Sequence, residues 1–266
     1  MKIKIILLVV LTFLSCSSDD NTVVESQEEP LIIELVTNNT NVTIDEVVTF
    51  QVKTNKPFGS ITYSTDNFIT SKTVGKSLGD SFGTSLTLYV NTANIGKITH
   101  SIEVSDANNP SKKAKSSLSF TVEKGNAVRI KDVLVNSFYD KDNIWDTEFS
   151  NTDPNRLADV FFVLQKPQIG TLTGQFQQQL WYKSNVKENQ GDLKWDLLQD
   201  NLYVNPNAII QLGLADDDGG GIAQDLLLGP PYEKDINLSQ YISTKPDNII
   251  FEDNSINLDV DFGLEW

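Results

Sequence analysis

The sequence predicts an all-β protein made of two β-sandwich domains in tandem. Short runs of alternating apolar and polar residues, rich in Val, Ile, Thr and aromatics, recur along the chain. A period of two is typical of strands with one buried face. Clusters of Asn, Asp, Gly and Pro separate these runs, as turns do. The length of 266 residues allows two domains of ordinary size.

The first domain is expected to span residues 31–124. Its clearest alternating runs lie at residues 47–52, 60–64, 85–90, 99–104 and 117–122. About seven strands in such a length are typical of a sandwich, and the last run resembles bacterial immunoglobulin-like or PKD-type surface modules. His100, the single histidine of the chain, lies on one of these runs. We interpret it as a structural or surface residue, because neither a second His nor a thiol accompanies it.

The second domain, residues 125–266, differs from the first in its charge. Residues 31–124 hold 9 basic and 8 acidic side chains, whereas residues 125–266 hold 10 basic and 23 acidic ones. Strands are expected at residues 128–135, 159–164, 179–183, 195–204, 209–214 and 257–264. The four tryptophans all lie in this half: Trp145, Trp181, Trp195 and Trp266. This second domain must therefore tolerate concentrated negative charge.

Composition excludes several classes of function. One Cys, one His and one Met exclude a disulfide framework, a Cys/His zinc site and any mechanism that needs two histidines. A net charge of −15 argues against nucleic acid as a partner. The sequence contains neither a nucleophile elbow nor a phosphate-binding loop. We therefore expect a protein that is not an enzyme, with a glycosidase that uses two carboxylates as the alternative.

Two acidic segments of the second domain follow predicted strands, at residues 139–158 and 216–225. Each is expected to end in an Asp that opens the next strand, Asp159 in one case and Asp225 in the other. If both segments lie at one end of a sandwich, their carboxylates converge. Two carboxylates about 5 Å apart repel each other by roughly 3 kcal/mol at an effective dielectric near 20. Bound Ca²⁺ would reverse the sign of that energy, because it accepts six to eight oxygen ligands and needs no His or Cys.

Four short patterns occur in the same order as in the C2 domain, a sandwich that binds calcium between loops at one end. They are Trp145-Asp146, Asp159 before an apolar strand, the Asp-x-Asp of Asp216 and Asp218, and Asp225 followed by three leucines and Gly229. The second domain resembles this family over about 130 residues. The resemblance implies five calcium ligands: Asp146, Asp159, Asp216, Asp218 and Asp225. Asp140 or Asp142 could take the place of Asp146. The resemblance also suggests Trp145 and Ile222 as loop residues that contact a partner.

The N-terminus carries the pattern of an export signal. Lys2 and Lys4 precede an apolar run at residues 5–14, which is too short to span a bilayer, and Ser15 precedes Cys16. This pattern resembles a bacterial lipoprotein signal, with residues 1–15 as the signal peptide and Cys16 as the lipidated residue. An ordinary secretory signal with a chance cysteine is the alternative. Residues 16–30 are expected to form an acidic flexible tether, and its first acidic residues resemble the surface-export signal of Bacteroidota lipoproteins.

Together these features predict a non-enzymatic, lipid-anchored, calcium-binding adhesion or scaffold protein of the outer membrane, exposed at the cell surface. Two alternatives stay open: a glycan-binding lipoprotein with a structural calcium ion, and calcium-dependent phospholipid binding. The expected partners are the membrane, through the lipid on Cys16, and a surface glycan or protein. The identity of that partner, the number of calcium ions, the oligomeric state and a periplasmic location are left open.

Overall fold

The computed structural model describes residues 29–266 except residues 38 and 78. The expected signal, Cys16 and most of the tether lie outside these residues. The chain divides at Pro30 into a first segment and one compact unit, Leu31–Trp266. The described part contains strands and short 3₁₀ helices but no α-helix, which confirms the all-β class. In the same part, no helix has the length and apolar character needed to cross a membrane.

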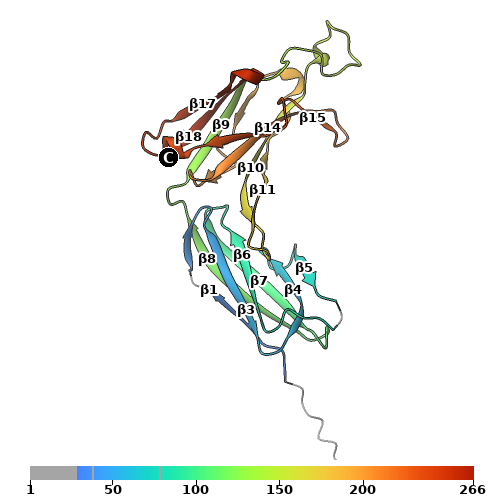
Figure 1. The fold of residues 1–266 in the computed structure, drawn as a ribbon, viewed down its shortest axis with the longest axis vertical. Helices are drawn as coiled ribbons and strands as arrows, with labels where there is room; N and C mark the ends of the chain where they lie inside the picture. Colours follow the sequence, from blue (N-terminus) through green and yellow to red (C-terminus); the bar gives the residue numbers. More distant parts are fainter. Residues whose placement is uncertain (1–28, 38, 78) are drawn as a thin grey trace, which may run out of the picture. The chain divides into compact units, whose positions relative to one another are not determined.

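The N-terminal half folds into two sheets, shown in blue to green in Figure 1. One sheet has the order β1-β3-β6, from β1 (Ile33–Thr37), β3 (Val47–Thr54) and β6 (Ser85–Asn91). The other has the order β2-β8-β7-β4-β5, from β2 (Asn41–Thr43), β8 (Lys113–Glu123), β7 (Gly96–Asp106), β4 (Phe58–Ser64) and β5 (Lys72–Gly75). All five runs predicted for this half lie within observed strands.

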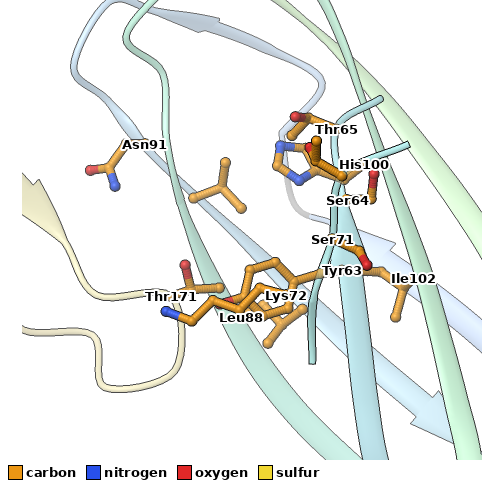
Figure 2. Close-up of a pocket in the computed structure, with 12 residues that line it drawn as sticks. Tyr63, Ser64, Thr65, Ser71, Lys72, Leu88, Asn91, His100, Ile102 and Thr171 are labelled. Atoms are coloured by element: carbon orange, nitrogen blue, oxygen red, sulfur yellow. The ribbon is translucent and has the colours of Figure 1, made fainter. Parts of the chain in front are cut away.

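The core of the N-terminal half follows from the alternation of its strands. Val48, Phe50 and Val52 point to the same face of β3 and are buried, as period-two patterning requires. Residues from both sheets join them in one apolar cluster. His100 on β7 is part of this interior: it is 8% exposed and stacks on Phe120, with ring centroids 5.6 Å apart. Figure 2 shows this histidine beside a cavity.

The C-terminal half also contains two sheets. The first has the order β11-β10-β14-β15, with β16 also paired to β14, and is built from β10 (Val160–Ile169), β11 (Phe176–Lys183), β14 (Ile209–Asp217), β15 (Ala223–Asp225) and β16 (Lys234–Asn237). The second has the order β12-β9-β18-β17, with β13 also paired to β9. Its strands are β9 (Val128–Ser137), β12 (Lys194–Asp196), β13 (Leu202–Val204), β17 (Asn248–Asp253) and β18 (Leu258–Glu265).

Both sheets of the C-terminal half contribute to a second apolar cluster. Trp195 is central to it: its ring meets Phe162 edge-on at 5.1 Å, and its indole N–H donates to the Asn185 carbonyl at 2.8 Å. The buried apolar residues change from the first cluster to the second between Ala127 and Val128. The division at residues 124 and 125 itself stays a prediction.

Two expectations about strands are corrected by the structure. Residues 195–204 form two three-residue strands instead of one, and both pair with β9. A turn separates them, in which the Asp196 carboxylate accepts the Leu198 N–H and Asn201 adopts a positive φ of 52°. Asp225 does not open a strand but closes β15. The polar turn residues between these strands explain why the alternating pattern alone was misleading.

A buried lysine occupies the core-facing side of β10. Lys166 follows the buried Val160, Phe162 and Leu164 at spacings of two and is 1% exposed. Its ammonium donates to Asp45 Oδ1 at 2.6 Å and lies 4.4 Å from the centre of the Trp181 ring. Burial lowers the pKa of Lys166, and the Asp45 carboxylate opposes this shift. A buried charge of this kind is stable only because it is paired.

Candidate metal site

The antiparallel pairing of β10 and β14 brings the two acidic segments to one end of their sheet. Val160, the first residue of β10, is in register with Asp216 near the end of β14. The Asp159 N–H donates to Asp216 Oδ1 at 2.6 Å, and the Asp217 N–H donates to the Asp159 carbonyl at 3.0 Å. Residues 57 positions apart in the sequence are thereby fixed beside one another.

Strand alternation explains why Asp216 is buried. Ile210, Leu212 and Leu214 point from β14 into the core, and Asp216 is the next residue on the same face. Asp216 is 0% exposed, whereas Asp218, two residues further along the chain, is exposed. The strand therefore places the Asp216 carboxylate at the edge of the apolar core and the Asp218 carboxylate just outside it.

Arg156 fixes the long acidic segment between β9 and β10. Its guanidinium donates to the carbonyls of Asn151, Asp142 and Asn143 at 2.8 to 3.2 Å. The carbonyl of Arg156 in turn accepts the N–H groups of Trp145 and Asp146, at 2.8 and 3.2 Å. These bonds hold the loop backbone at Asp146 against Arg156.

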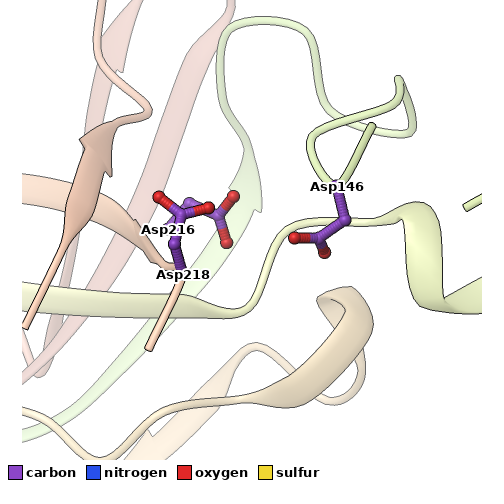
Figure 3. A group of neighbouring side chains, drawn as sticks. All are labelled: Asp146, Asp216 and Asp218. Atoms are coloured by element: carbon purple, nitrogen blue, oxygen red, sulfur yellow. The ribbon is translucent and has the colours of Figure 1, made fainter. Parts of the chain in front are cut away.

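Asp146, Asp216 and Asp218 converge, as Figure 3 shows. One carboxylate oxygen of each lies within 4.8 Å of the others. At this separation, each pair of charges repels by about 3 kcal/mol at an effective dielectric near 20. The second oxygen of Asp216, Oδ2, is buried and has no hydrogen-bond partner among the residues that the structure describes. The three side chains offer only hard oxygen donors, so this group can hold a metal ion.

The pKa values of two of these carboxyls reflect the same crowding. Burial, together with the negative charges of Asp146, Asp218 and Asp159, raises the pKa of Asp216 to about 6, although the Asp159 N–H opposes the shift. Burial also raises the pKa of Asp146, with Glu148, Asp159 and Asp218 adding to the effect. Both shifts have the direction expected for buried carboxylates that share a site.

A cavity of about 380 Å³ lies beside this group, and Asp146 and Asp218 line it, whereas Asp216 does not. Among the described residues, no Lys, Arg or His lines the cavity. Its lining consists of carboxylates, amides, a glycine and one aromatic ring: Asp146, Glu148, Phe149, Asn155, Asp159, Glu188, Asn189, Asp217, Asp218 and Gly219. Its walls are therefore suited to a cation and unsuited to an anion.

The other predicted ligands lie outside the group of three carboxylates. Asp159 lines the cavity, but its Oδ1 accepts the Asn189 N–H at 2.7 Å, so it ties two segments together beside the group. Asp225 is exposed, pairs with Ala215, and lies outside the group of three. Asp140 and Asp142, the alternatives to Asp146, also lie outside it, in turn positions with positive φ.

Sequence reasoning did not identify Glu148, Glu188 and Asn189 as part of the site. Glu148 follows Asp146 at a spacing of two, and this Asp-x-Glu pattern is a sequence signal that could have indicated a second acidic residue at the site. Glu188 and Asn189 belong to a short 3₁₀ helix, Glu188–Gln190, in which Asn189 adopts a left-handed φ of 54°. Nothing in the sequence around Glu188 distinguishes it from a solvent-exposed acidic turn.

The two predicted contact residues have different surroundings. Trp145 is half-buried, packs against the core, and donates its indole N–H to the Asp140 carbonyl at 3.2 Å. Ile222 is 66% exposed and lies in the turn between β14 and β15. Phe149, which lines the acidic cavity, is 36% exposed. Ile222 and Phe149 are thus apolar side chains available at the same end of the sheet.

Comparison with known proteins places this fold in no family. No family model matches the sequence, and no curated protein matches it. A structure search matches the dimeric latent PorU from Porphyromonas gingivalis at 15% identity and a TM-score of 0.28. The match covers 80% of this chain and 20% of that one, so the chain spans about a fifth of the length of PorU. The function proposed below therefore depends on this chain's own residues.

Proposed function

We propose that this protein is a non-enzymatic, lipid-anchored adhesion or scaffold protein of the cell surface, whose second half binds Ca²⁺ at Asp146, Asp216 and Asp218. The anchor is proposed from the sequence around Cys16. The bound ion would join the 138–158 loop to the β14–β15 turn and so stiffen the surface that meets a partner.

The observation that carries the metal site is the Oδ2 atom of Asp216. A buried acceptor without a partner costs about 1–3 kcal/mol, and more when it is charged. Asp216 is fully buried, and its neighbours Asp146 and Asp218 supply further negative charge instead of a donor. A bound cation would satisfy this oxygen and remove the repulsion at the same time.

Calcium fits this donor set better than other metals. The cavity offers oxygen atoms from carboxylates and amides, which hard cations prefer, and it offers neither His nor Cys. Side chains from three separate segments form it, and loose geometry of this kind suits an ion that accepts six to eight oxygens. Mg²⁺ instead requires a near-ideal octahedron and keeps most of its water. An extracellular calcium module is expected to bind with a Kd of about 10⁻⁴–10⁻³ M.

A thermal unfolding series with Ca²⁺ tests the proposal. The wild-type Tm is expected to rise with added Ca²⁺ and to fall back with a chelator. The double variant Asp216→Ala/Asp218→Ala should lose this response. Asp225→Ala serves as the matched control, because this residue is also an acidic residue of the β14–β15 segment but lies outside the group. A wild-type Tm that does not change with Ca²⁺ would refute the site.

Exposed apolar residues beside the site support a second candidate, calcium-dependent association with phospholipid. Ile222 and Phe149 would insert into the interface, and bound Ca²⁺ would bridge the acidic cavity to anionic headgroups. Sedimentation with vesicles that contain phosphatidylserine tests this candidate. Wild-type protein should pellet with Ca²⁺ and not with chelator, and Ile222→Asp should remain soluble. Calcium-independent sedimentation, or none at all, would leave adhesion to a protein or glycan as the proposed role.

A further inference from the structure

Strand β11 is an open edge of the sheet β11-β10-β14-β15. It pairs with β10 on one side, and Figure 1 shows the two strands beside each other. Among the strands that the structure describes, none pairs with its other side. All five residues of Phe176–Leu180 are exposed, and Phe176 and Leu180 are each 60% exposed. An open edge of this kind presents backbone N–H and C=O groups that can pair with another strand.

The hydrogen bonds of Ile169 show which backbone groups of β11 face the open edge. Ile169 lies opposite Phe176 in the register of β10 and β11. Its N–H donates to Asn91 Oδ1 at 2.7 Å, and its carbonyl accepts from Asn91 Nδ2 at 3.0 Å, so neither group bonds to Phe176. Because bonded and non-bonded pairs alternate along antiparallel strands, the backbone groups of Phe176, Gln178 and Leu180 point to the open edge.

The lack of charge on β11 distinguishes it from the other sheet edges of the described chain. Charged residues, which oppose pairing with a further strand, lie on six other edge strands: Glu34 of β1, Lys72 of β5, Lys194 and Asp196 of β12, Asp225 of β15, Lys234 and Asp235 of β16, and Glu252 and Asp253 of β17. Strands β2 and β13 have three residues each. The edge of β6 is covered, because the Tyr89 N–H donates to the Thr171 carbonyl at 2.9 Å. The one charge of β11, Lys183, is its last residue.

The side chains along this edge are complementary to themselves. Residues 176–180 read Phe-Gln-Gln-Gln-Leu. When a second copy pairs antiparallel about Gln178, Phe176 of each copy lies opposite Leu180 of the other. Gln177 then lies opposite Gln179, and the two Gln178 residues face each other. Apolar side chains meet apolar ones, amides meet amides, and no two charges are opposed, which is the condition for a favourable strand pair.

We propose that two copies of this protein pair through β11, antiparallel and with Gln178 at the two-fold axis, so that their sheets become continuous. About six backbone hydrogen bonds form, two at each facing pair of residues whose backbone groups point outward. Each copy uses its one open edge, so the assembly closes at the dimer. A five-residue pairing buries less than about 1,200 Å², which is typical of weak and transient contacts. We therefore expect a Kd between about 10 μM and 1 mM.

Analytical ultracentrifugation over a range of concentrations tests the dimer. Protein that begins at residue 29 keeps all four sheets, both apolar clusters and the whole compact unit, and its mass should rise from monomer to dimer. Gln178→Lys places two positive charges opposite each other and should raise the Kd at least about tenfold. Gln178→Ala is the matched control: it also removes the amide that donates to the Ile209 carbonyl at 3.1 Å, but it adds no charge and should dimerise like wild type. A monomer up to about 1 mM, a mass that grows beyond the dimer, or equal weakening by both variants would overturn the proposal.

Disulfide trapping tests the register of the pairing. Protein that begins at residue 29 lacks Cys16, the single cysteine of the chain, so each introduced thiol is the only one. Gln178→Cys should give a linked dimer on mild oxidation, because facing Cα atoms of a hydrogen-bonded pair are about 5.5 Å apart, within disulfide range. Gln199→Cys, in an exposed turn, measures random collision. Phe176→Cys mixed with Leu180→Cys should link to each other and not to themselves. The reverse pattern, or a Gln178→Cys yield no higher than that of Gln199→Cys, would overturn the proposal.

Discussion

Replacing Asp216 with asparagine tests the physical reasoning behind the metal site, because the account predicts that this change stabilises the ion-free protein. Burial raises the pKa of Asp216 from its ordinary value of 3.8 to about 6 in the folded chain. The folded state therefore binds the proton more tightly than the unfolded state does. In metal-free protein, stability is lost as the pH rises from about 4 to about 6, and the loss is complete above that range.

The size of this effect follows from the same shift. A change from 3.8 to about 6 corresponds to about 3 kcal/mol, and relaxation of the structure around a buried charge reduces it to about 2 kcal/mol. In Asp216→Asn, the amide side chain keeps an oxygen that can accept the Asp159 N–H, and it carries no charge. In a chelator at pH 7, the variant should therefore be about 2 kcal/mol more stable to unfolding than wild type, and its stability should depend less on pH.

Calcium should reverse this order. At a Ca²⁺ concentration of about 100 times Kd, the wild type gains about 2.7 kcal/mol from ligand binding, whereas Asp216→Asn gains much less. Urea unfolding in chelator and in Ca²⁺, at pH 5 and pH 7, measures all of these quantities. Asp225→Asn should behave like wild type under each condition. A variant that is less stable than wild type in chelator at pH 7, or that gains equally from Ca²⁺, would refute the reasoning.

Three further changes test other parts of the account. Arg156→Leu removes donors to three loop carbonyls and should weaken Ca²⁺ binding about tenfold by calorimetry. An unchanged affinity would show that the loop is held in other ways. Lys166→Met should cost about 3 kcal/mol in urea unfolding, because it leaves the Asp45 carboxylate without its cation, and adding Asp45→Asn should restore part of it. Trp195→Phe should cost about 2 kcal/mol through the lost bond to Asn185 and the smaller ring; a neutral result would contradict the assigned core role.

Alternation predicted the strands well where one face of the sheet is buried and the other is exposed to solvent. The run that contains Phe50 and the run that contains Phe162 were both found, because period two and burial are the same physical signal there. The signal fails for short strands. Trp195 and Leu202 lie on separate strands that the pattern joined. β16 follows the turn at Pro230 and Pro231, β17 follows Pro246, and neither strand was predicted. Burial from a tertiary neighbour, and not local periodicity, fixes those segments.

The approach of the segment before β10 to Asp216 and Asp218 could be anticipated, because residues just before and just after paired antiparallel strands meet at one sheet end. Asp146 lies well before β10, and only the hydrogen bonds of its loop to Arg156 bring it there. The exclusion of Asp225 could not be anticipated, since it depends on where the three-residue β15 ends. The same limit applies to Glu188, which reaches the cavity through a separate turn. Lys166 looked like a polar strand residue in the sequence, and only its pairing with Asp45, far away in the chain, explains its burial.

A crystal structure determined in the presence of Ca²⁺ tests the central claim most directly. An ion should lie between Asp146, Asp216 and Asp218, with Asp216 Oδ2 among its ligands and oxygen distances of about 2.3–2.6 Å. Anomalous scattering would identify the element. If calcium-saturated crystals instead showed Asp216 Oδ2 bound to a water or a protein donor, with no ion beside it, the claim that the three carboxylates form a metal site would be wrong.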